Sequence, residues 1–482
     1  MAVRSLGRMK SIAELAVIFL ADIVSVYAVF RLSVFLRESV LPLFYRHFPA
    51  VVPEWGIGDL WWIFVVWVFF FYYEGLYTKR LSFWDEVGAL WKVAFFSTVS
   101  VFTILSVGKL GDQMSRTVIV LMGQFALVLF PLFRLPLKKS LRKTGLLHRR
   151  VLILGAGETG RLVLKALRKE PNFGYEVLGF LDDDPAKVGR EIDGIKVHRG
   201  TDKAEVYIKR CNIEDLFIAM PGAGKERLQG LINSLQHKVE RILFVPDIFG
   251  IAVTGTNLQH FFHEEAFALE MKNNMSNPFN IAVKRCFDLV TSALLLPVLA
   301  VPMALTALLI RLDSPGPAIF SQERVGRKGR IFRCYKFRTM HADAEERLGR
   351  LLEGDSLAKA KWDKHWKLDD DPRVTGIGRF LRTTSLDELP QILNVLTGDM
   401  SLVGPRPVTQ EEIDIHYRDS AELCFSVPPG ITGLWQVSGR SNTGYDYRIT
   451  LDSWYVRNWN LWLDLVILLK TVRIVIRKEG AY

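Results

Sequence analysis

The residues best suited to chemistry lie between positions 382 and 407. Two adjacent carboxylates, Asp387 and Glu388, stand between Arg382 and Arg406, and the second arginine lies between two prolines. A pair of carboxylates attracts a cation, and arginine guanidiniums match the geometry of phosphate oxygens. We therefore expect a site that binds Mg²⁺ and a phosphate group, and in which a carboxylate attacks phosphorus.

A structural explanation competes for the same two acids. Ser385 and Glu388 have the spacing of a capping box, in which both side chains satisfy backbone donors at the start of a helix expected over 386–396. The start of a helix also favours negative charge, so it would lower the pKa of a carboxylate and keep it ionised as a nucleophile. The motif alone leaves capping and catalysis open, and the flanking cations favour catalysis.

Further basic and aromatic residues could complete the site. Lys336 and Arg338 alternate along an expected strand, so they lie on one side of it and could neutralise phosphate charge. A turn-rich loop over 428–440 adds groups that could stack on a nucleotide base, hydrogen-bond it and meet a phosphate: Trp435, Gln436 and Arg440. The alternative for Trp435 is a packed side chain in a structural hairpin.

The chain that must position these residues begins with four apolar stretches long enough to span a bilayer. They cover approximately 11–36, 58–77, 91–110 and 116–136. Basic residues precede the first stretch and follow the fourth, which places both flanks in the cytoplasm. The formal charge of +11 fits anionic partners, and the aromatic-rich apolar runs favour membrane lipids over nucleic acid.

A fifth apolar stretch, residues 286–310, differs because it contains Pro297 and Pro302 and has basic residues on both sides. A full crossing would export one basic cluster, against the positive-inside tendency. We expect a re-entrant helix over about 284–311 that breaks at one of the two prolines and keeps both ends inside. A fifth span with a proline kink is the alternative.

The middle of the chain has the pattern of a dinucleotide-binding fold. An apolar run leads into Gly155, Gly157 and Gly160 in the spacing G-x-G-x-x-G, and a second apolar run ends in the acids at 182–184. The three glycines are weak candidates for cofactor binding, because many such domains keep the turn for packing alone. No Tyr-x-x-x-Lys pair of the short-chain nucleotide-sugar enzymes occurs in the sequence.

Five ordered motifs resemble the bacterial monotopic phosphoglycosyl transferases over about 280–482. The motifs are Lys284-Arg285-x-Phe287-Asp288, Tyr335-Lys-Phe-Arg-Thr-Met340, Ser385-Leu-Asp-Glu-Leu-Pro-Gln391, Asn394-Val-Leu-x-Gly-Asp-Met-Ser-Leu-Val-Gly-Pro-Arg-Pro407 and Pro429-Gly-Ile-Thr-Gly-Leu-Trp-Gln-Val-Ser-Gly-Arg440. With a membrane bundle and a glycine-turn domain in front, the chain resembles the long form, the polyprenyl-phosphate hexose-1-phosphate transferases. The family often has a Ser-Pro pair at the bend of its re-entrant helix, whereas Val301 precedes Pro302 here.

The resemblance implies an activity and roles for individual residues. Asp387 would attack the β-phosphate of a UDP-hexose, giving a phospho-sugar enzyme intermediate and UMP, while Glu388 and Asp387 would hold Mg²⁺. The sugar phosphate would then pass to undecaprenyl phosphate, beginning O-antigen, capsule or exopolysaccharide synthesis, with galactose favoured and glucose possible. The resemblance also implies a multi-pass protein of the bacterial inner membrane whose active site faces the cytoplasm.

These observations predict a three-part architecture. A transmembrane α-helical bundle over 1–144 precedes a Rossmann-like α/β domain over 145–270, which is expected to be regulatory or to form a homodimer. The monotopic α/β catalytic domain follows over 279–482 and ends in an amphipathic helix over 461–478. Two other functions stay open: a membrane-anchored nucleotide-sugar oxidoreductase or dehydratase that uses the glycine turn, and a non-catalytic scaffold for polysaccharide assembly.

Overall fold

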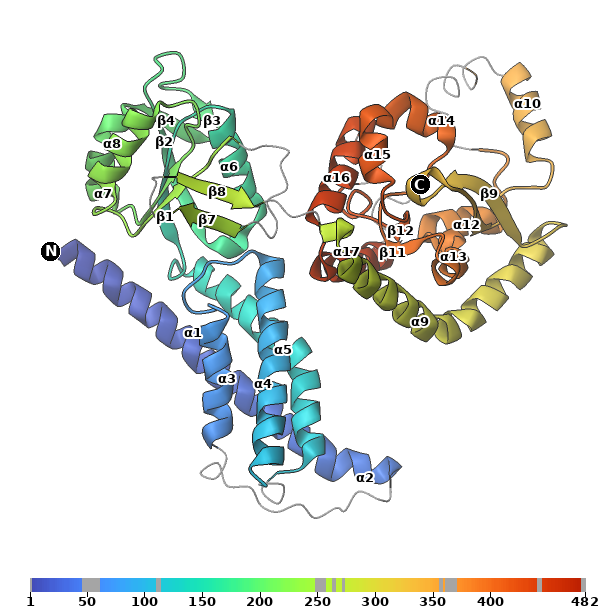
Figure 1. The fold of residues 1–482 in the computed structure, drawn as a ribbon, viewed down its shortest axis with the longest axis horizontal. Coiled ribbons are helices and arrows are strands. Elements are labelled where there is room, and N and C mark those ends of the chain that lie inside the picture. Colours follow the sequence, from blue (N-terminus) through green and yellow to red (C-terminus); the bar gives the residue numbers. More distant parts are fainter. Residues whose placement is uncertain are drawn as a thin grey trace. The chain divides into compact units, whose positions relative to one another are not determined.

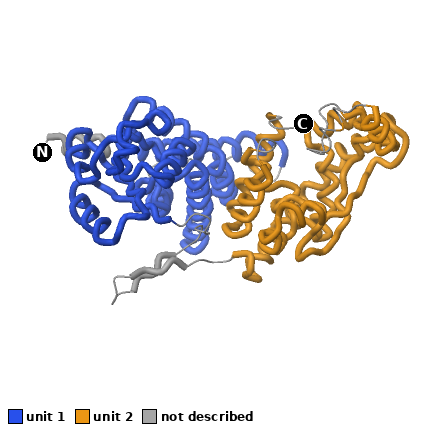
Figure 2. The backbone as a smooth tube through the Cα atoms, turned by 90° about the horizontal axis from the view of Figure 1, so that it is seen from above, with its two compact units in different colours: residues 1–248 blue, residues 249–482 orange. Residues whose placement is uncertain are grey.

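A computed structural model describes most of the chain in two compact units, Met1–Ile248 and Phe249–Tyr482 (Figure 2). The described residues are 2–45, 61–109, 114–247, 257–261, 266–270, 274–354, 359, 371–439 and 444–477. We call the two parts unit 1 and unit 2, and each is described by itself.

Unit 1 begins with apolar helices that pack as a bundle. They are α1 (Ala2–Phe35), which continues through a π-helical turn (Leu36–Val40) into α2 (Leu41–Phe44), then α3 (Trp61–Tyr73), α4 (Phe83–Val107) and α5 (Arg116–Lys143). Residues 13–44, α4 and α5 are each long and apolar enough to cross a membrane, whereas α3 has 13 described residues. The expected third stretch therefore begins earlier than residue 91, because Ser82 caps α4 by accepting a hydrogen bond from the Asp85 backbone N–H.

Side chains from these helices form one apolar core with a buried ion cluster at its edge. Trp67 of α3 meets Phe130 of α5 edge to face, with 5.3 Å between ring centroids. Arg134 of α5 is 3% exposed and pairs with Asp22 of α1 and with Glu86 of α4, whose Oε1 lies 2.9 Å from Nε. One guanidinium thus joins three helices.

The second part of unit 1 is a six-stranded sheet in the order β3-β4-β2-β1-β5-β6. Its strands are β1 (Arg149–Leu154), β2 (Tyr175–Asp182), β3 (Glu191–Ile192), β4 (Ile195–Arg199), β5 (Asp215–Ile218) and β6 (Arg241–Phe244). All pairs except β3 with β4 are parallel. Helix α6 (Glu158–Lys169) covers one face, and α7 (Ala204–Cys211) and α8 (Lys225–Leu235) cover the other (Figure 1). The expected Rossmann-like α/β fold is confirmed.

The described part of unit 2 is an α/β arrangement with three two-stranded sheets and a long helix. Its helices include α9 (Pro278–Asp313), α10 (Ala344–Gly354), α12 (Gly376–Thr384), α13 (Gln391–Thr397), α14 (Gln410–Glu412), α15 (Ala421–Cys424), α16 (Tyr445–Asn458) and α17 (Leu461–Arg477). Its strands are β7 (Asn257–Phe261), β8 (Ala266–Glu270), β9 (Ile319–Val325), β10 (Ile331–Phe337), β11 (Ser401–Val403) and β12 (Gly430–Thr432). Strands β9 and β10 form an antiparallel hairpin, and β11 pairs with β12 in parallel.

Helix α9 is the apolar segment expected to break at a proline. It runs for 36 residues through both Pro297 and Pro302 as one helix, and Figure 1 shows it bent near its middle. The expected break is present as a bend and not as a gap in the helix (Figure 1), since each proline removes one backbone donor without ending the helix. Leu294 and Val298 are 71% and 70% exposed, as suits a helix that faces lipid. The re-entrant path stays a prediction.

Candidate active site

The two acids lie on a short 3₁₀ turn between α12 and α13. The turn covers Leu386–Glu388 and follows Ser385, whose left-handed backbone (φ 56°) ends α12. The Ser385 side chain caps no backbone donor, and α13 begins only at Gln391 after Pro390. The predicted capping box and the helix start at 386 are therefore wrong. The Glu388 carboxylate meets cations that come from other elements.

Strand β10 brings the first cation to this turn. The Asn394 side chain of α13 accepts a hydrogen bond from the Tyr335 backbone N–H at 3.0 Å and donates to the Arg333 carbonyl at 2.8 Å, which fixes β10 against α13. The next residue, Lys336, places Nζ 2.8 Å from Glu388 Oε1 and 4.0 Å from Asp387 Oδ2. Lys336 therefore lies beside both acids, and its expected role in neutralising phosphate charge stays a prediction.

The second cation comes from the loop after β11. Arg406 NH2 lies 3.5 Å from Glu388 Oε1, on the same oxygen that Lys336 contacts. The loop is held by two backbone hydrogen bonds to the strand region opposite: Gly404 N to Thr432 O at 2.9 Å and Gly430 N to Pro405 O at 2.8 Å. A Cβ on Gly430 would lie 2.1 Å from Gly404 N, so only glycine permits this close approach.

The motif at 284–288 anchors β11 to α9. Lys284 Nζ donates to the Val403 carbonyl at 3.0 Å and to Asp464 Oδ2 of α17 at 2.7 Å. Asp288 accepts hydrogen bonds from the Ser401 hydroxyl at 2.7 Å and the Leu402 backbone N–H at 3.2 Å. These groups are buried, and they fix the strand that leads directly into the Arg406 loop. This part of the motif therefore has a positioning role.

Arg382 and Arg338, which were also predicted to bind substrate, have different surroundings from Arg406. Arg382 Nε donates to Thr339 Oγ1 at 3.0 Å, and its charge acts on Asp387 without a direct ion pair among the described residues. Arg338 NH2 donates to the Ser314 carbonyl at 2.6 Å, so it closes the end of α9 rather than joining the carboxylates. The structure brings Lys336, Arg406 and Arg382 to the acids and places Arg338 elsewhere.

The electrostatics of the two acids differ from the sequence-based expectation. Burial raises the pKa of Asp387, and the adjacent Glu388 carboxylate raises it further, while Lys336, Arg406 and Arg382 oppose the shift. The expected lowering of this pKa by a helix start is wrong, because burial and Glu388 outweigh the groups that lower it. Glu388 raises the pKa of Arg406, whereas burial lowers the pKa of Arg382. The three cations thus favour the charged form of Asp387, against the effects of burial and of Glu388.

The turn-rich loop places its aromatic residue against an arginine that the sequence analysis missed. The guanidinium carbon of Arg448, on α16, lies 5.0 Å from the centre of the Trp435 ring. Gln436 is buried, and its Nε2 lies 3.5 Å from the Ile431 carbonyl. Arg440 lies outside the described residues. Arg448 and Asp452 have helical i, i+4 spacing, but such pairs are common on helices and gave no specific signal.

The donor set at the turn fits magnesium. Mg²⁺ in proteins usually takes one or two carboxylates and completes its shell with water and substrate phosphates. Asp387 and Glu388 supply two neighbouring carboxylates whose side chains are 16% and 18% exposed. Elsewhere in the described part of the chain, no cluster of three or more His, Cys, Asp or Glu residues has metal-binding geometry.

The glycine turn of unit 1 is largely explained by backbone packing. Gly155 has φ of +100°, and a Cβ there would lie 2.5 Å from the Ala219 carbonyl oxygen; a Cβ on Gly160 would lie 2.2 Å from the Gly155 oxygen. Only Gly157 has open space around it. The Asp182 carboxylate, at the end of β2, accepts a hydrogen bond from the Ala156 backbone N–H at 2.7 Å. Cofactor binding by these glycines stays a prediction.

Comparison with known proteins places this chain among transferases. Residues 279–478 match the family described as bacterial sugar transferase, and residues 73–246 match a family described as CoA-binding domain. Undecaprenyl-phosphate galactose phosphotransferase of Salmonella typhimurium strain LT2 is 39% identical over 84% of each chain. UDP-galactose-lipid carrier transferase of Erwinia amylovora is 35% identical over 84% of each chain. UDP-glucose:undecaprenyl-phosphate glucose-1-phosphate transferase of Escherichia coli strain K12 is 34% identical over 69% of this chain and 68% of its own. The chain therefore belongs to the bacterial sugar transferase family.

Proposed function

We propose that this transferase moves hexose-1-phosphate from a UDP-hexose to undecaprenyl phosphate, giving undecaprenyl-diphospho-hexose and UMP. The observation that carries the proposal is the turn on which Asp387 and Glu388 meet Lys336 and Arg406. Two carboxylates and two cations within 4.0 Å of them suit a diphosphate with a divalent cation. The names of the relatives support the same substrate classes.

In the first step, a carboxylate oxygen of Asp387 attacks the β-phosphorus of the UDP-hexose. The bond between that phosphorus and the oxygen bridging it to the α-phosphate breaks, and UMP leaves with the bonding electrons. The product is an acyl phosphate on Asp387 that carries the hexose. Lys336, Arg382 and Arg406 stabilise the charge that develops on the phosphate oxygens, since fixed cations need no reorganisation as the reaction proceeds.

In the second step, a phosphate oxygen of undecaprenyl phosphate attacks the same phosphorus. The bond from phosphorus to the Asp387 oxygen breaks, which regenerates the carboxylate and releases the lipid-linked diphospho-hexose. Splitting the transfer into two displacements lets one group of cations serve both substrates in turn. It also predicts that UMP can leave before the lipid substrate arrives.

Magnesium held by Glu388 and Asp387 would neutralise phosphate charge when bound. Lys336 already contacts Glu388 Oε1 at 2.8 Å, so this lysine orients the carboxylate toward the shared site. The pair of cations on Glu388 leaves Asp387 with the weaker direct contact, at 4.0 Å from Lys336 Nζ. We propose that Glu388 is the principal magnesium ligand and that Asp387, which also lies at the metal site, is the nucleophile.

Galactose is the hexose that we propose. The two relatives that share 84% of this chain are named for galactose, whereas the glucose relative from Escherichia coli shares 69%. The lipid product would begin assembly of O-antigen, capsule or exopolysaccharide. We propose an inner-membrane location with the turn on the cytoplasmic face, where nucleotide sugars are available, and a homodimer as the working state.

Product analysis with a panel of donors tests this function. Purified full-length protein in lipid nanodiscs is incubated with undecaprenyl phosphate, magnesium and UDP-galactose, UDP-glucose or UDP-N-acetylglucosamine, and UMP and lipid products are quantified. We expect UMP and one labelled lipid from UDP-galactose, lost in Asp387→Asn and kept in Asp419→Asn, which changes an exposed acid of unit 2. No UMP from folded protein with any donor would overturn the proposal.

A further inference from the structure

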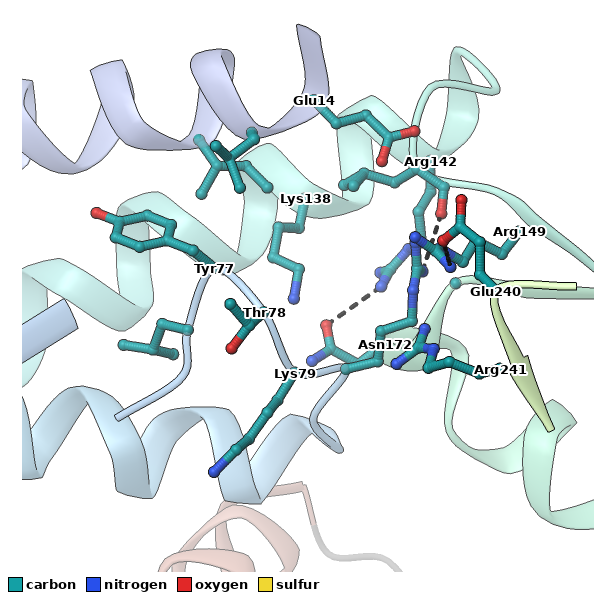
Figure 3. Close-up of a pocket in the computed structure, with 16 residues that line it drawn as sticks. Glu14, Tyr77, Thr78, Lys79, Lys138, Arg142, Arg149, Asn172, Glu240 and Arg241 are labelled. Carbon is teal, nitrogen blue, oxygen red and sulfur yellow. Dashed lines mark hydrogen bonds and ion pairs between the residues drawn. The ribbon is translucent and has the colours of Figure 1, made fainter. Parts of the chain in front are cut away.

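Unit 1 contains a cavity of about 280 Å³ where its membrane helices meet its α/β sheet (Figure 3). Its walls come from the start of α1, the connection between α3 and α4, the end of α5, and the region where β1, β2 and β6 begin. The volume is near the lower end of the range of about 300–1,000 Å³ found for small-molecule pockets. A headgroup or a small phosphate compound would match it.

The cavity lining is strongly basic. Six cationic side chains line it: Lys79, Arg80, Lys138, Arg142, Arg149 and Arg241. Glu14 and Glu240 are the acids of the same lining, which leaves a surplus of four positive charges. Figure 3 shows Lys138, Arg142 and Arg149 extending toward the same space. An excess of this size in a confined space attracts an anion.

Part of this charge is neutralised by ion pairs. Arg241 NH2 lies 3.0 Å from Asp215 Oδ2, and Arg149 NH1 lies 3.2 Å from Asp215 Oδ1 and 2.6 Å from Glu240 Oε2. Lys138 Nζ lies 2.6 Å from the buried Glu86 carboxylate. These three cations are therefore paired with acids, and their ion pairs stabilise the cavity lining.

Within the described part of the chain, two arginines donate hydrogen bonds to neutral groups, while nearby acids act on their charge: Glu14 and Asp215 on Arg80, and Glu86 on Arg142. Arg80 NH1 donates to the Phe173 carbonyl at 2.6 Å and the Leu147 carbonyl at 3.3 Å. Arg142 NH1 donates to the Asn172 side-chain oxygen at 3.2 Å. A guanidinium has five donors, so each arginine can still bind an anion. Burial lowers the pKa of Arg80, and the nearby Arg149 lowers it further, as expected for excess positive charge.

The backbone around Arg80 leaves room for its guanidinium. Gly174 has φ of +67°, and a Cβ at this position would lie 2.8 Å from Arg80 NH1 and 2.6 Å from the Leu147 carbonyl oxygen. Glycine thus permits both the turn and the approach of the guanidinium. The arginine is held in place by the fold.

The opposite wall of the cavity is apolar and belongs to the membrane helices. Leu15 and Ile18 of α1 line it together with Leu76, which follows α3. Leu15 is 47% exposed, so the apolar wall continues onto the outer surface of α1. The cavity therefore combines a cationic wall with an apolar wall at the end of a membrane bundle.

We propose that this cavity binds a phosphate-bearing ligand, with Arg80 and Arg142 as its principal contacts. Guanidiniums bind phosphate through paired, charge-assisted hydrogen bonds. Two sources supply the same chemistry: the headgroup of an anionic lipid, whose chains would follow the apolar wall, and a soluble phosphate compound. The site is separate from the carboxylate turn of unit 2 and does not depend on the function proposed for that turn.

The test compares two single-charge changes on neighbouring residues in the full-length chain. Arg142→Gln removes a cation of the cavity and keeps a donor for Asn172, whereas Lys143→Gln removes an exposed charge one residue away that does not line the cavity. One arm uses nanodiscs of phosphatidylcholine with or without phosphatidylglycerol and counts retained anionic lipid by native mass spectrometry. The other arm titrates inorganic pyrophosphate in detergent and follows the unfolding midpoint.

Binding at unit 2 is common to all three proteins, so the difference between the two variants isolates the cavity. We expect binding about tenfold weaker in Arg142→Gln than in the wild type or Lys143→Gln, in at least one arm, for the loss of a charge-assisted contact. Arg142→Lys serves as a second variant that keeps the charge, and it is expected to retain most of the binding. Weaker lipid binding by Arg142→Gln than by Lys143→Gln identifies a lipid headgroup as the ligand. Weaker pyrophosphate binding by Arg142→Gln identifies a soluble phosphate compound. Equal binding by Arg142→Gln and Lys143→Gln in both arms, or none by the wild type, would overturn the proposal.

Discussion

Lys336 Nζ lies 2.8 Å from Glu388 Oε1 and 4.0 Å from Asp387 Oδ2, so one ammonium group serves both carboxylates of the turn. Arg406 reaches the same Glu388 oxygen from the loop after β11. Strand β10 and the loop after β11 thus converge on the two adjacent side chains of the turn. This convergence supports the proposed phosphate-transfer site over an acidic turn with a purely structural role.

The first prediction concerns Lys336. Lys336→Met removes the cation nearest both acids, so we expect kcat/KM for UMP release to fall about 10²–10³-fold, as for loss of one preorganised charge at a reacting group. Lys336→Arg keeps the positive charge but changes the shape of the side chain, so we expect a smaller decrease in kcat/KM. Steady-state kinetics with the preferred donor measure both. An unchanged kcat/KM in Lys336→Met would show that this lysine has no part in the reaction.

The second prediction concerns the ion cluster of the membrane bundle. Arg134→Met leaves the Asp22 and Glu86 carboxylates buried without their shared guanidinium. We expect unit 1 to lose about 3–5 kcal/mol of stability, the usual cost of breaking a buried ion pair. The unfolding midpoint in detergent measures this loss, with Arg116→Met as control, because that arginine is exposed at the start of the same helix. Equal midpoints for the two variants would contradict the structural role of the cluster.

The third prediction concerns the close approach of two backbone segments beside Arg406. Gly430→Ala places a Cβ 2.1 Å from Gly404 N, so the two strands must separate and the Arg406 loop must move. Overpacking of this kind costs about 1–3 kcal/mol, and we expect a loss of transferase activity beyond the loss of stability. Gly376→Ala is the matched control, since a Cβ at that position meets nothing within 4 Å. Full activity in Gly430→Ala would show that the loop position is unimportant.

The fourth prediction is a pH dependence of stability that originates at Asp452. Burial raises the pKa of this carboxyl to about 7, although Arg448 and the hydroxyl of Tyr417 oppose the shift. The folded chain therefore binds a proton more tightly than the unfolded chain, whose ordinary value is 3.8. The stabilising effect of protonation is full below the unfolded pKa and is lost as pH rises toward about 7.

Asp452→Asn removes this titration while its side chain can still accept a hydrogen bond from Tyr417. The unfolding midpoint of the wild type, measured relative to Asp452→Asn, should fall as pH rises from 5 to about 7. A constant difference between the two proteins across that range would mean that Asp452 does not titrate there.

The sequence predicted the Rossmann-like part of the fold well because its signals are local. An apolar run, a glycine turn and an apolar helix each report on neighbouring residues, and β1, α6 and β2 appear where the pattern placed them. The predicted bounds of the membrane helices were less accurate than the predicted bounds of β1, α6 and β2. Helix α4 extends to Phe83 because the Ser82 cap and the tertiary contact with α5 compensate for the polar residues at its start.

The carboxylate turn shows why part of the site could not be predicted. Ser385 adopts a left-handed conformation that ends α12, and local spacing alone suggested the start of a helix. Sequence position cannot show that Lys336 would approach from β10 while Arg338 turns to Ser314, because that choice depends on where α9 ends. Arg448 was missed for the same reason, since its partner Trp435 lies on a different segment.

The most direct test of the central claim is to look for a covalent phospho-sugar on Asp387. Full-length protein is incubated with magnesium and UDP-galactose in the absence of undecaprenyl phosphate, quenched rapidly, digested and analysed by mass spectrometry. We predict one equivalent of UMP per active site and a hexose-phosphate adduct on the peptide that contains residue 387, absent in Asp387→Asn and discharged by added undecaprenyl phosphate. UMP release by Asp387→Asn at the wild-type rate, or an adduct confined to another residue, would contradict the account.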